Sequence, residues 1–133
     1  EMHYRYPDRV GLTIGFVPEL SKKIYAGADM FLMPSQSEPC GLAQMIALRY
    51  GTIPIVRETG GLRDSIHDAG DKSGNGFTFK SYNAHDMLDA VVRARAYYDD
   101  KMKWGRLVNT ALKQDFSWTK SAKDYIALYN DIH

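Results

Sequence analysis

Two polar turns in this chain of 133 residues each follow a short apolar run and lead directly into a helical pattern. The first turn spans residues 34–41, and the second spans residues 57–62. In open α/β sheets, ligands bind at the carboxyl ends of the strands, where turns of this kind lie. The start of a helix also offers unpaired N–H groups and a partial positive charge, which together attract anions. The turns therefore predict the binding of a phosphate group.

The residue types within the two turns are suited to this role. Gly60 and Gly61 have no Cβ, so the backbone can come close to a phosphate at these positions. Each feature also has an ordinary explanation: a Gly-Gly pair before a helix is most often a simple turn, Glu38 alone is a solvated carboxylate, and Cys40 is a small buried residue. The occurrence of two such turns, each directly after a strand, favours a binding site.

The elements that must position the turns alternate between strand and helix patterns, which is typical of a parallel sheet covered by helices. Strands are predicted over residues 10–16, 29–33, 53–56 and 76–79, with imperfect pairing at Pro54. Helices are predicted from Pro18, from near Leu42 to Gly51, over residues 62–66, 84–99 and 101–113, and from Ser117, with a surface loop over residues 68–75. The predicted fold class is α/β, with an incomplete Rossmann-like parallel sheet and flanking helices in one domain of residues 1–133.

Residues at spacings of three and four predict which sides of the helices pack. In the helix after the first turn these residues are Leu42, Met45, Ile46, Arg49 and Tyr50. For the helix over residues 84–99, with Asn83 as its N-cap, the predicted inner stripe is Met87, Leu88, Val91, Val92 and Arg95. The last helix has an amphipathic stripe that needs a partner surface, made of Trp118, Ala122, Tyr125, Tyr129 and Ile132.

Composition excludes several classes of function. The formal net charge is +1 and the basic residues are scattered, so no nucleic-acid partner is expected. No apolar run reaches the roughly 20 residues that span a bilayer, so no membrane partner is expected. The single cysteine excludes an internal disulfide and is compatible with a reducing compartment, which predicts a cytoplasmic location. The four histidines lack metal-ligand spacing, so no metal is expected.

Three separated motifs resemble those of bacterial glycogen synthases and plant starch synthases. They are ADMFLMPSQSEPCGL at residues 28–42, ALRYGTIPIVRETGGLRD at residues 47–64 and DFSW at residues 115–118. The resemblance covers essentially the whole chain and implies the C-terminal, donor-nucleotide-binding domain of a GT-B glycosyltransferase. It implies that the full protein transfers glucose from ADP-glucose, with retention, to the non-reducing end of an α-1,4-glucan, without a separate cofactor. The domain is expected to be truncated and inactive alone, because the N-terminal domain with its acceptor site lies outside the chain.

The resemblance also implies roles for individual residues. Glu38 corresponds to the glutamate that hydrogen-bonds hydroxyls of the donor glucose and is the catalytic residue expected. Phe16 falls where the family has an aromatic ring that stacks on adenine. The other donor-binding residues implied are Cys40, Gly41 and Leu42 beside the sugar, and Thr59, Gly60 and Gly61 around the diphosphate.

Two alternatives to this function stay open. The chain could be a non-catalytic module that binds a nucleotide or a glucan. It could also belong to another retaining GT-B enzyme that uses a UDP-sugar, such as a sucrose-type or cell-wall glycosyltransferase. Many GT-B enzymes of that broader group have a second glutamate eight positions after the first, where this chain has Ile46. Ile46 therefore favours the glycogen synthase family.

The predicted strand order leaves a gap in the sheet. In the Rossmann order 3-2-1-4-5-6, residues 10–16 would form strand three and residues 29–33 strand four, and the two strands between them are absent from the sequence. The N–H and C=O groups beside this gap need partners. We expect residues 10–16 to pair directly with residues 29–33 or with another copy of the chain, which would allow self-association through the open sheet edge.

Overall fold

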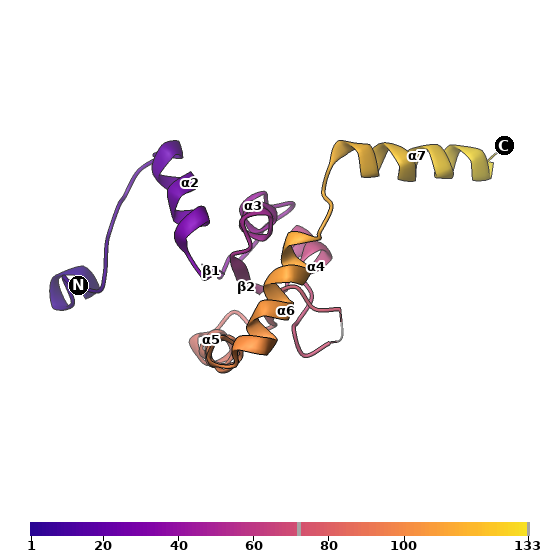
Figure 1. Cartoon of the computed structure of the whole chain (residues 1–133). Helices are drawn as coiled ribbons and strands as arrows, with labels where there is room; N and C mark the ends of the chain where they lie inside the picture. The colour runs from indigo at the N-terminus through magenta and orange to yellow at the C-terminus, as the bar shows by residue number, and fades with distance from the viewer. Residues whose placement is uncertain (72, 133) are drawn as a thin grey trace.

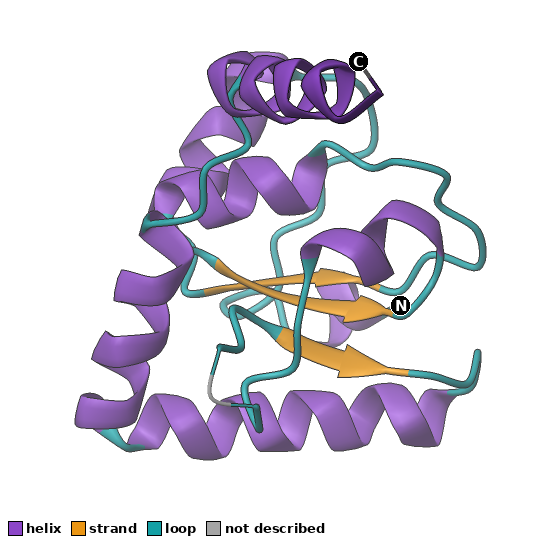
Figure 2. Ribbon diagram, turned by 90° about the vertical axis from the view of Figure 1, so that its right-hand side faces the viewer, coloured by secondary structure: helices purple, strands orange, loops and turns teal. Residues whose placement is uncertain are grey.

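The computed structural model describes residues 1–71 and 73–132, and within them three parallel strands form one sheet. The strands are β1 (Met30–Met33), β2 (Ile53–Arg57) and β3 (Phe77–Phe79), in the spatial order β1-β2-β3. The helices are α1 (Met2–Arg5), α2 (Pro18–Gly27), α3 (Ala43–Tyr50), α4 (Gly60–Ser65), α5 (Ala84–Asp99), α6 (Lys101–Leu112) and α7 (Trp118–Ile132). Figure 2 shows the strands running in the same direction between layers of helices. The predicted α/β class, with a parallel sheet and flanking helices, is confirmed.

The central strand β2 is buried along its length and carries a proline without losing a hydrogen bond to β1. The Ile53 N–H donates to Asp29 O (3.0 Å), toward β1. Because N–H groups alternate in direction along a strand, the Pro54 nitrogen faces β3. Pairing between β2 and β3 begins only at the next residue, where Ile55 lies opposite Phe77. Pro54 therefore occupies a position that needs no donor, which agrees with the imperfect pairing predicted there.

Helix α5 covers one face of the sheet and begins where the sequence predicts. The Asn83 side chain accepts a hydrogen bond from the Asp86 N–H (2.9 Å), as an N-cap does. The predicted inner stripe is partly wrong, because Leu88 and Val92 are 57% and 58% exposed and Arg95 is exposed as well. Ala90 faces the sheet instead, together with Ala94. Leu88 and Val92 each lie two positions from Ala90, about 200° around the helix, so they point away.

Helix α3 packs on the rest of the core through a face that the spacing did not indicate. Its buried residues are Gln44, Ala47 and Leu48, whereas Ile46 and Tyr50 are exposed. The helix ends at Gly51, which has a left-handed φ of 77° and donates to Leu48 O (3.0 Å). This glycine C-cap is as predicted.

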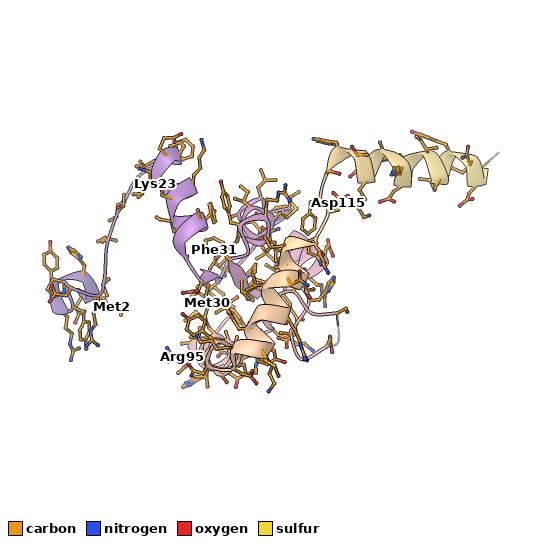
Figure 3. The ribbon with its side chains drawn as sticks, viewed as in Figure 1. Met2, Lys23, Met30, Phe31, Arg95 and Asp115 are labelled. Atoms are coloured by element: carbon orange, nitrogen blue, oxygen red, sulfur yellow. The ribbon has the colours of Figure 1, made fainter. Side chains whose placement is uncertain are left out.

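The prediction of a strand over residues 10–16 is wrong. Within the described chain, no backbone hydrogen bond joins this segment to the sheet, and it lies apart from the sheet in Figure 1. Figure 3 likewise shows Met2 of α1, the helix that precedes this segment, far from Met30 and Phe31 of β1. Its direct pairing with residues 29–33 is therefore also wrong. An extended segment becomes a strand only beside a partner for its N–H and C=O groups, and α2 leads from this segment into β1 without supplying one.

Helix α7 extends away from the sheet at the other end of the molecule (Figure 1). None of its residues described in the structure is buried, and Trp118 and Tyr125 at the start and middle of its stripe are exposed. The predicted partner surface is thus not supplied by the described chain. None of the described helices has the length and apolar character that a membrane crossing requires.

An ion pair fixes α5 to β3 and to the loop before it. Arg93 Nη1 lies 2.7 Å from Asp68 Oδ2, and Arg93 Nη2 donates to Thr78 O (2.7 Å). Asp68 belongs to the loop predicted over residues 68–75, of which Lys72 lies outside the described residues. Burial raises the pKa of the Asp68 carboxyl, but hydrogen bonds from Arg93, Thr78 and Gly70 outweigh it and lower the pKa below its ordinary value of 3.8. The Thr78 hydroxyl donates to Glu58 (2.8 Å), which is part of the second turn.

The lowered pKa of Asp68 predicts how the stability of the protein depends on pH. A carboxyl with a depressed pKa in the folded state stabilises the fold above its unfolded pKa, and this contribution is lost as pH falls through the folded pKa. We expect Asp68→Asn to lower the free energy of unfolding by about 1 kcal/mol at pH 7, since the pair is partly exposed to solvent. The difference from the unaltered protein should shrink below about pH 4.

Urea unfolding at a series of pH values between 3 and 7 measures this effect. Asp89→Asn is the matched control, because Asp89 pairs with the same arginine but is far more exposed, and it should change stability little. A difference between Asp68→Asn and the unaltered protein that stays constant from pH 7 to pH 3 would contradict the prediction.

Candidate functional site at the carboxyl edge of the sheet

The two turns singled out in the sequence meet at the carboxyl edge of the sheet. The first follows β1 and leads into α3, and the second follows β2 and leads into α4. The Gly61 N–H of the second turn donates to Glu38 O (3.2 Å) and Pro39 O (3.1 Å) of the first. The structure therefore brings Glu38, Cys40 and Gly41 together with Thr59, Gly60 and Gly61, as the sequence predicted.

The glycines of the second turn are required by the first turn. A Cβ on Gly60, whose φ is +42°, would lie 2.1 Å from Glu38 O, and one on Gly61 would lie 1.9 Å from Cys40 O. No side chain fits at either position while the turns stay in contact. The sequence suggested that these glycines admit a phosphate, whereas in the structure they admit the backbone of the other turn. The Gly61 N–H is already engaged, and the Gly60 N–H has no partner among the described residues.

The first turn presents backbone donors and small side chains. In the part of the chain that the structure describes, the N–H groups of Cys40, Gly41 and Leu42 have no hydrogen-bond partner. The Cys40 thiol and the Leu42 side chain are exposed, and Glu38 is half-buried. Together with Gly60, the turn offers a group of open N–H donors beside one carboxylate, an arrangement suited to a ligand that carries both hydroxyl and phosphate groups.

Phe16 is not part of this arrangement. Its side chain is 95% exposed, and it ends the segment that lies apart from the sheet in Figure 1. The structure of this chain therefore does not place Phe16 beside the two turns.

The third motif does lie close to the first. Residues 114–117 and the exposed side of α3 line a groove of about 500 Å³, which includes Leu42, Met45 and Phe116. The residues that the sequence placed at spacings of three and four in this helix, such as Met45 and Ile46, thus form one wall of the groove. Among the described residues, no group of three or more His, Cys, Asp or Glu side chains is arranged to hold a metal ion.

Sequence reasoning missed Arg57, which holds the loops at this edge. Its guanidinium donates to Ser35 O (2.9 Å) and Gln36 O in the first turn, and to Lys80 O (3.3 Å) after β3. The guanidinium also lies 5.9 Å from the centre of the Tyr82 ring. A cation directly after the buried run IPIV was a signal in the sequence, because a charge there needs partners at the end of the strand.

Gln44 was also missed, although its place in the sequence marked it. It precedes the buried residues Ala47 and Leu48 by three and four positions, which puts a polar side chain on the buried face of α3. Its Nε2 donates to Cys40 O and Gly41 O in the first turn and to Ser65 Oγ at the end of α4. This buried side chain therefore joins the first turn to the end of α4, the helix that follows β2.

Comparisons with known proteins show which family the chain belongs to. Residues 4–106 match the family model of glycosyl transferases group 1. The chain is 54% identical over 134 residues to a glycogen synthase of Anoxybacillus flavithermus, an alignment that covers 99% of the chain and 28% of that protein. It is 55% identical over 133 residues to a glycogen synthase of Bacillus anthracis, with coverage of 98% and 28%. The chain thus spans about 28% of the length of these relatives.

Solved structures share the fold. The catalytic domain of Starch Synthase IV from Arabidopsis thaliana, bound to ADP and acarbose, matches with a TM-score of 0.86 and 44% identity, over 98% of this chain and 28% of that one. Sucrose-phosphate synthase from Thermosynechococcus elongatus matches with a TM-score of 0.68 and 24% identity, over 98% and 32%, which concerns the fold alone. The architecture is that of the C-terminal part of a GT-B glycosyltransferase. Since the family model covers more than half of its residues, the chain belongs to the glycosyl transferases of group 1.

Proposed function

We propose that residues 1–133 are a truncated C-terminal donor-nucleotide-binding domain of an α-1,4-glucan synthase. The full protein transfers glucose from ADP-glucose to the non-reducing end of a glucan, with retention. The observation that carries this proposal is the hydrogen bond from Gly61 N–H to Glu38 O and Pro39 O, which joins the two turns into one surface. The identity of 54–55% to glycogen synthases over nearly the whole chain supports the choice of substrate class.

The chemistry of glucosyl transfer fits the open groups of this surface. Positive charge develops on the sugar and negative charge on the departing diphosphate in the transition state. The free N–H groups of Gly60 and of residues 40–42 stabilise the negative charge without having to reorganise. Thr59 adds a hydroxyl beside them, and Glu38 accepts hydrogen bonds from hydroxyl groups of the donor glucose. No metal or other cofactor takes part in this proposal.

Because the chain spans about 28% of the length of its relatives, we expect the remaining parts of the site to come from other parts of the full protein. The α-glucan acceptor and the N-terminal domain of the same protein complete the site, so the chain alone is expected to be inactive. Phe16 stacks on adenine only in that complete protein. An exposed free cysteine, Cys40, is compatible with a reducing compartment, which supports the cytoplasmic location we propose.

Glu38→Ala in the full-length protein tests the assigned carboxylate. We expect kcat for glucosyl transfer from ADP-glucose to fall by about a hundredfold or more, because hydrogen bonds that strengthen in the transition state are lost. A coupled assay of ADP release measures it. Glu19→Ala is the control, since Glu19 is an exposed residue of α2 whose carboxylate pairs with Lys22, and it should leave transfer unchanged. Unchanged transfer in Glu38→Ala would remove Glu38 from the catalytic role.

The alternative functions differ in what the isolated chain binds. A glucan synthase domain should bind ADP weakly and UDP more weakly still, because part of the nucleotide site lies outside it, and should turn over no donor. A UDP-sugar enzyme would reverse this preference, and a glucan-binding module would bind maltooligosaccharide without either nucleotide. Calorimetric titration of residues 1–133 with ADP, UDP and maltoheptaose separates the three outcomes.

The open edge of β1 supports a further proposal about partners. β2 pairs with one side of β1, and no strand of the described chain pairs with the other side. Such an edge pairs readily with another chain, so residues 1–133 alone should self-associate through it. Sedimentation velocity at rising concentrations measures this, and Leu32→Lys should reduce it, because a lysine on an edge strand disfavours edge-to-edge pairing. A chain that stays monomeric at all concentrations would contradict the proposal.

A further inference from the structure

The amide of Gln44 lies between the first turn and Ser65, the last residue of α4. Its side chain is fully buried, and Nε2 donates to Gly41 O (2.9 Å), Ser65 Oγ (3.1 Å) and Cys40 O (3.2 Å). The orientation of the amide is set by these partners, because the reverse orientation would place Oε1 against two carbonyl oxygens.

This amide completes the fixation of the first turn. Gly61 N–H holds the carbonyl oxygens of Glu38 and Pro39, and Gln44 Nε2 holds those of Cys40 and Gly41. Four successive carbonyl oxygens are thus fixed by two groups. The N–H groups of residues 40–42, at the end of this turn and just before α3, have no partner in the described chain. These are the groups that the proposed function assigns to the donor.

Ser65 links the same amide to the second turn. Its hydroxyl accepts from Gln44 Nε2 and donates to Gly61 O (2.6 Å). Gly61 in turn donates through its N–H to Glu38 O and Pro39 O. The two turns are therefore joined by a continuous set of hydrogen bonds, the circuit. In it, Gln44 contacts the first turn directly and reaches the second through Ser65.

The circuit has a cost that an apolar residue would avoid. Gln44 Oε1 is buried and has no hydrogen-bond partner among the described residues, which costs about 1–3 kcal/mol. A Cβ on Gly41 would lie 2.5 Å from this oxygen, so Gly41, at a φ of +73°, leaves room for the amide. An apolar side chain of the same length would fill this space without an unpaired oxygen but would release the carbonyl oxygens of Cys40 and Gly41. The arrangement sacrifices stability to hold the turn.

We propose that Gln44, acting with Ser65, is a positioning residue that holds the two turns in the arrangement that binds the sugar diphosphate. The inference rests on the proposed function, since it concerns the same site. Loss of the amide lets residues 38–41 shift relative to Gly60 and Gly61, and a shift of about 1 Å at a transfer site can lower the rate a hundredfold.

The test uses the full-length protein with Gln44→Met, Ser65→Ala and Ser65→Thr. For Gln44→Met we expect kcat/KM for ADP-glucose to fall about 10- to 100-fold, with weaker ADP binding by calorimetry and an unchanged KM for the glucan. Ser65→Ala should show a smaller loss of the same kind, and Ser65→Thr, which keeps the hydroxyl, should stay close to the unaltered protein. Ser65→Ala also decides the question if Gln44→Met does not fold.

Thr52→Val is the matched control for lost stability. Thr52 is also buried, and its hydroxyl donates to Tyr25 O and to Ala28 O (3.0 Å), away from the two turns. It should lower the melting temperature, because its hydrogen bonds to two backbone carbonyl groups are lost, while leaving the KM for ADP-glucose unchanged. If Gln44→Met and Ser65→Ala both match Thr52→Val in donor kinetics and ADP binding, the positioning role is overturned. If the unaltered full-length protein neither transfers glucose nor binds ADP, the proposed function falls, and this inference falls with it.

Discussion

The Gly61 N–H and the carbonyl oxygens of Glu38 and Pro39 define how closely two backbones approach at the carboxyl edge of the sheet. At distances of 3.1–3.2 Å, the turns after β1 and β2 are in direct contact, and neither Gly60 nor Gly61 has room for a Cβ. Much of the remaining structure serves this approach. Parallel pairing brings the ends of β1 and β2 level, and α3 starts just after the first turn while α4 starts within the second. The site is therefore a product of main-chain packing, with side chains added to an edge that the sheet already brings together.

Most elements could be predicted from local chemistry, because their ends are fixed by residues with strong conformational preferences. Pro18 begins α2, Gly51 ends α3 with a left-handed φ, and the Asn83 side chain caps α5. Each of these preferences acts within one turn of the chain, so the sequence alone contains it. The strand predicted over residues 10–16 is a different case. Their alternating pattern is compatible with a strand, but a strand also needs a neighbour, and that condition is not local.

Helix faces were harder to predict than helix bounds. The spacing of apolar residues shows that they recur on one side of a helix, but it does not show which side packs against the rest of the protein. In α5 the buried face includes Ala90, whose small side chain lets the helix come close to its neighbours, and in α3 the buried face includes the polar Gln44. The two turns were found because glycines and a carboxylate follow strands. Gln44 and Arg57 were missed, because part of their hydrogen bonding is to groups far away in the sequence: the Ser65 hydroxyl, 21 residues from Gln44, and the Lys80 carbonyl, 23 residues from Arg57.

Arg57 connects the loops after all three strands of the sheet. It is the last residue of β2, and its guanidinium reaches the carbonyl groups of Ser35 and Gln36 beyond β1 and of Lys80 beyond β3. If one of these loops moved alone, its charge-assisted hydrogen bonds to Arg57 would break. Arg57 thus couples the positions of the loops at the carboxyl edge of the sheet. A movement of this edge relative to the rest of the protein would therefore carry the loops after the three strands together, and a hinge would have to lie outside them.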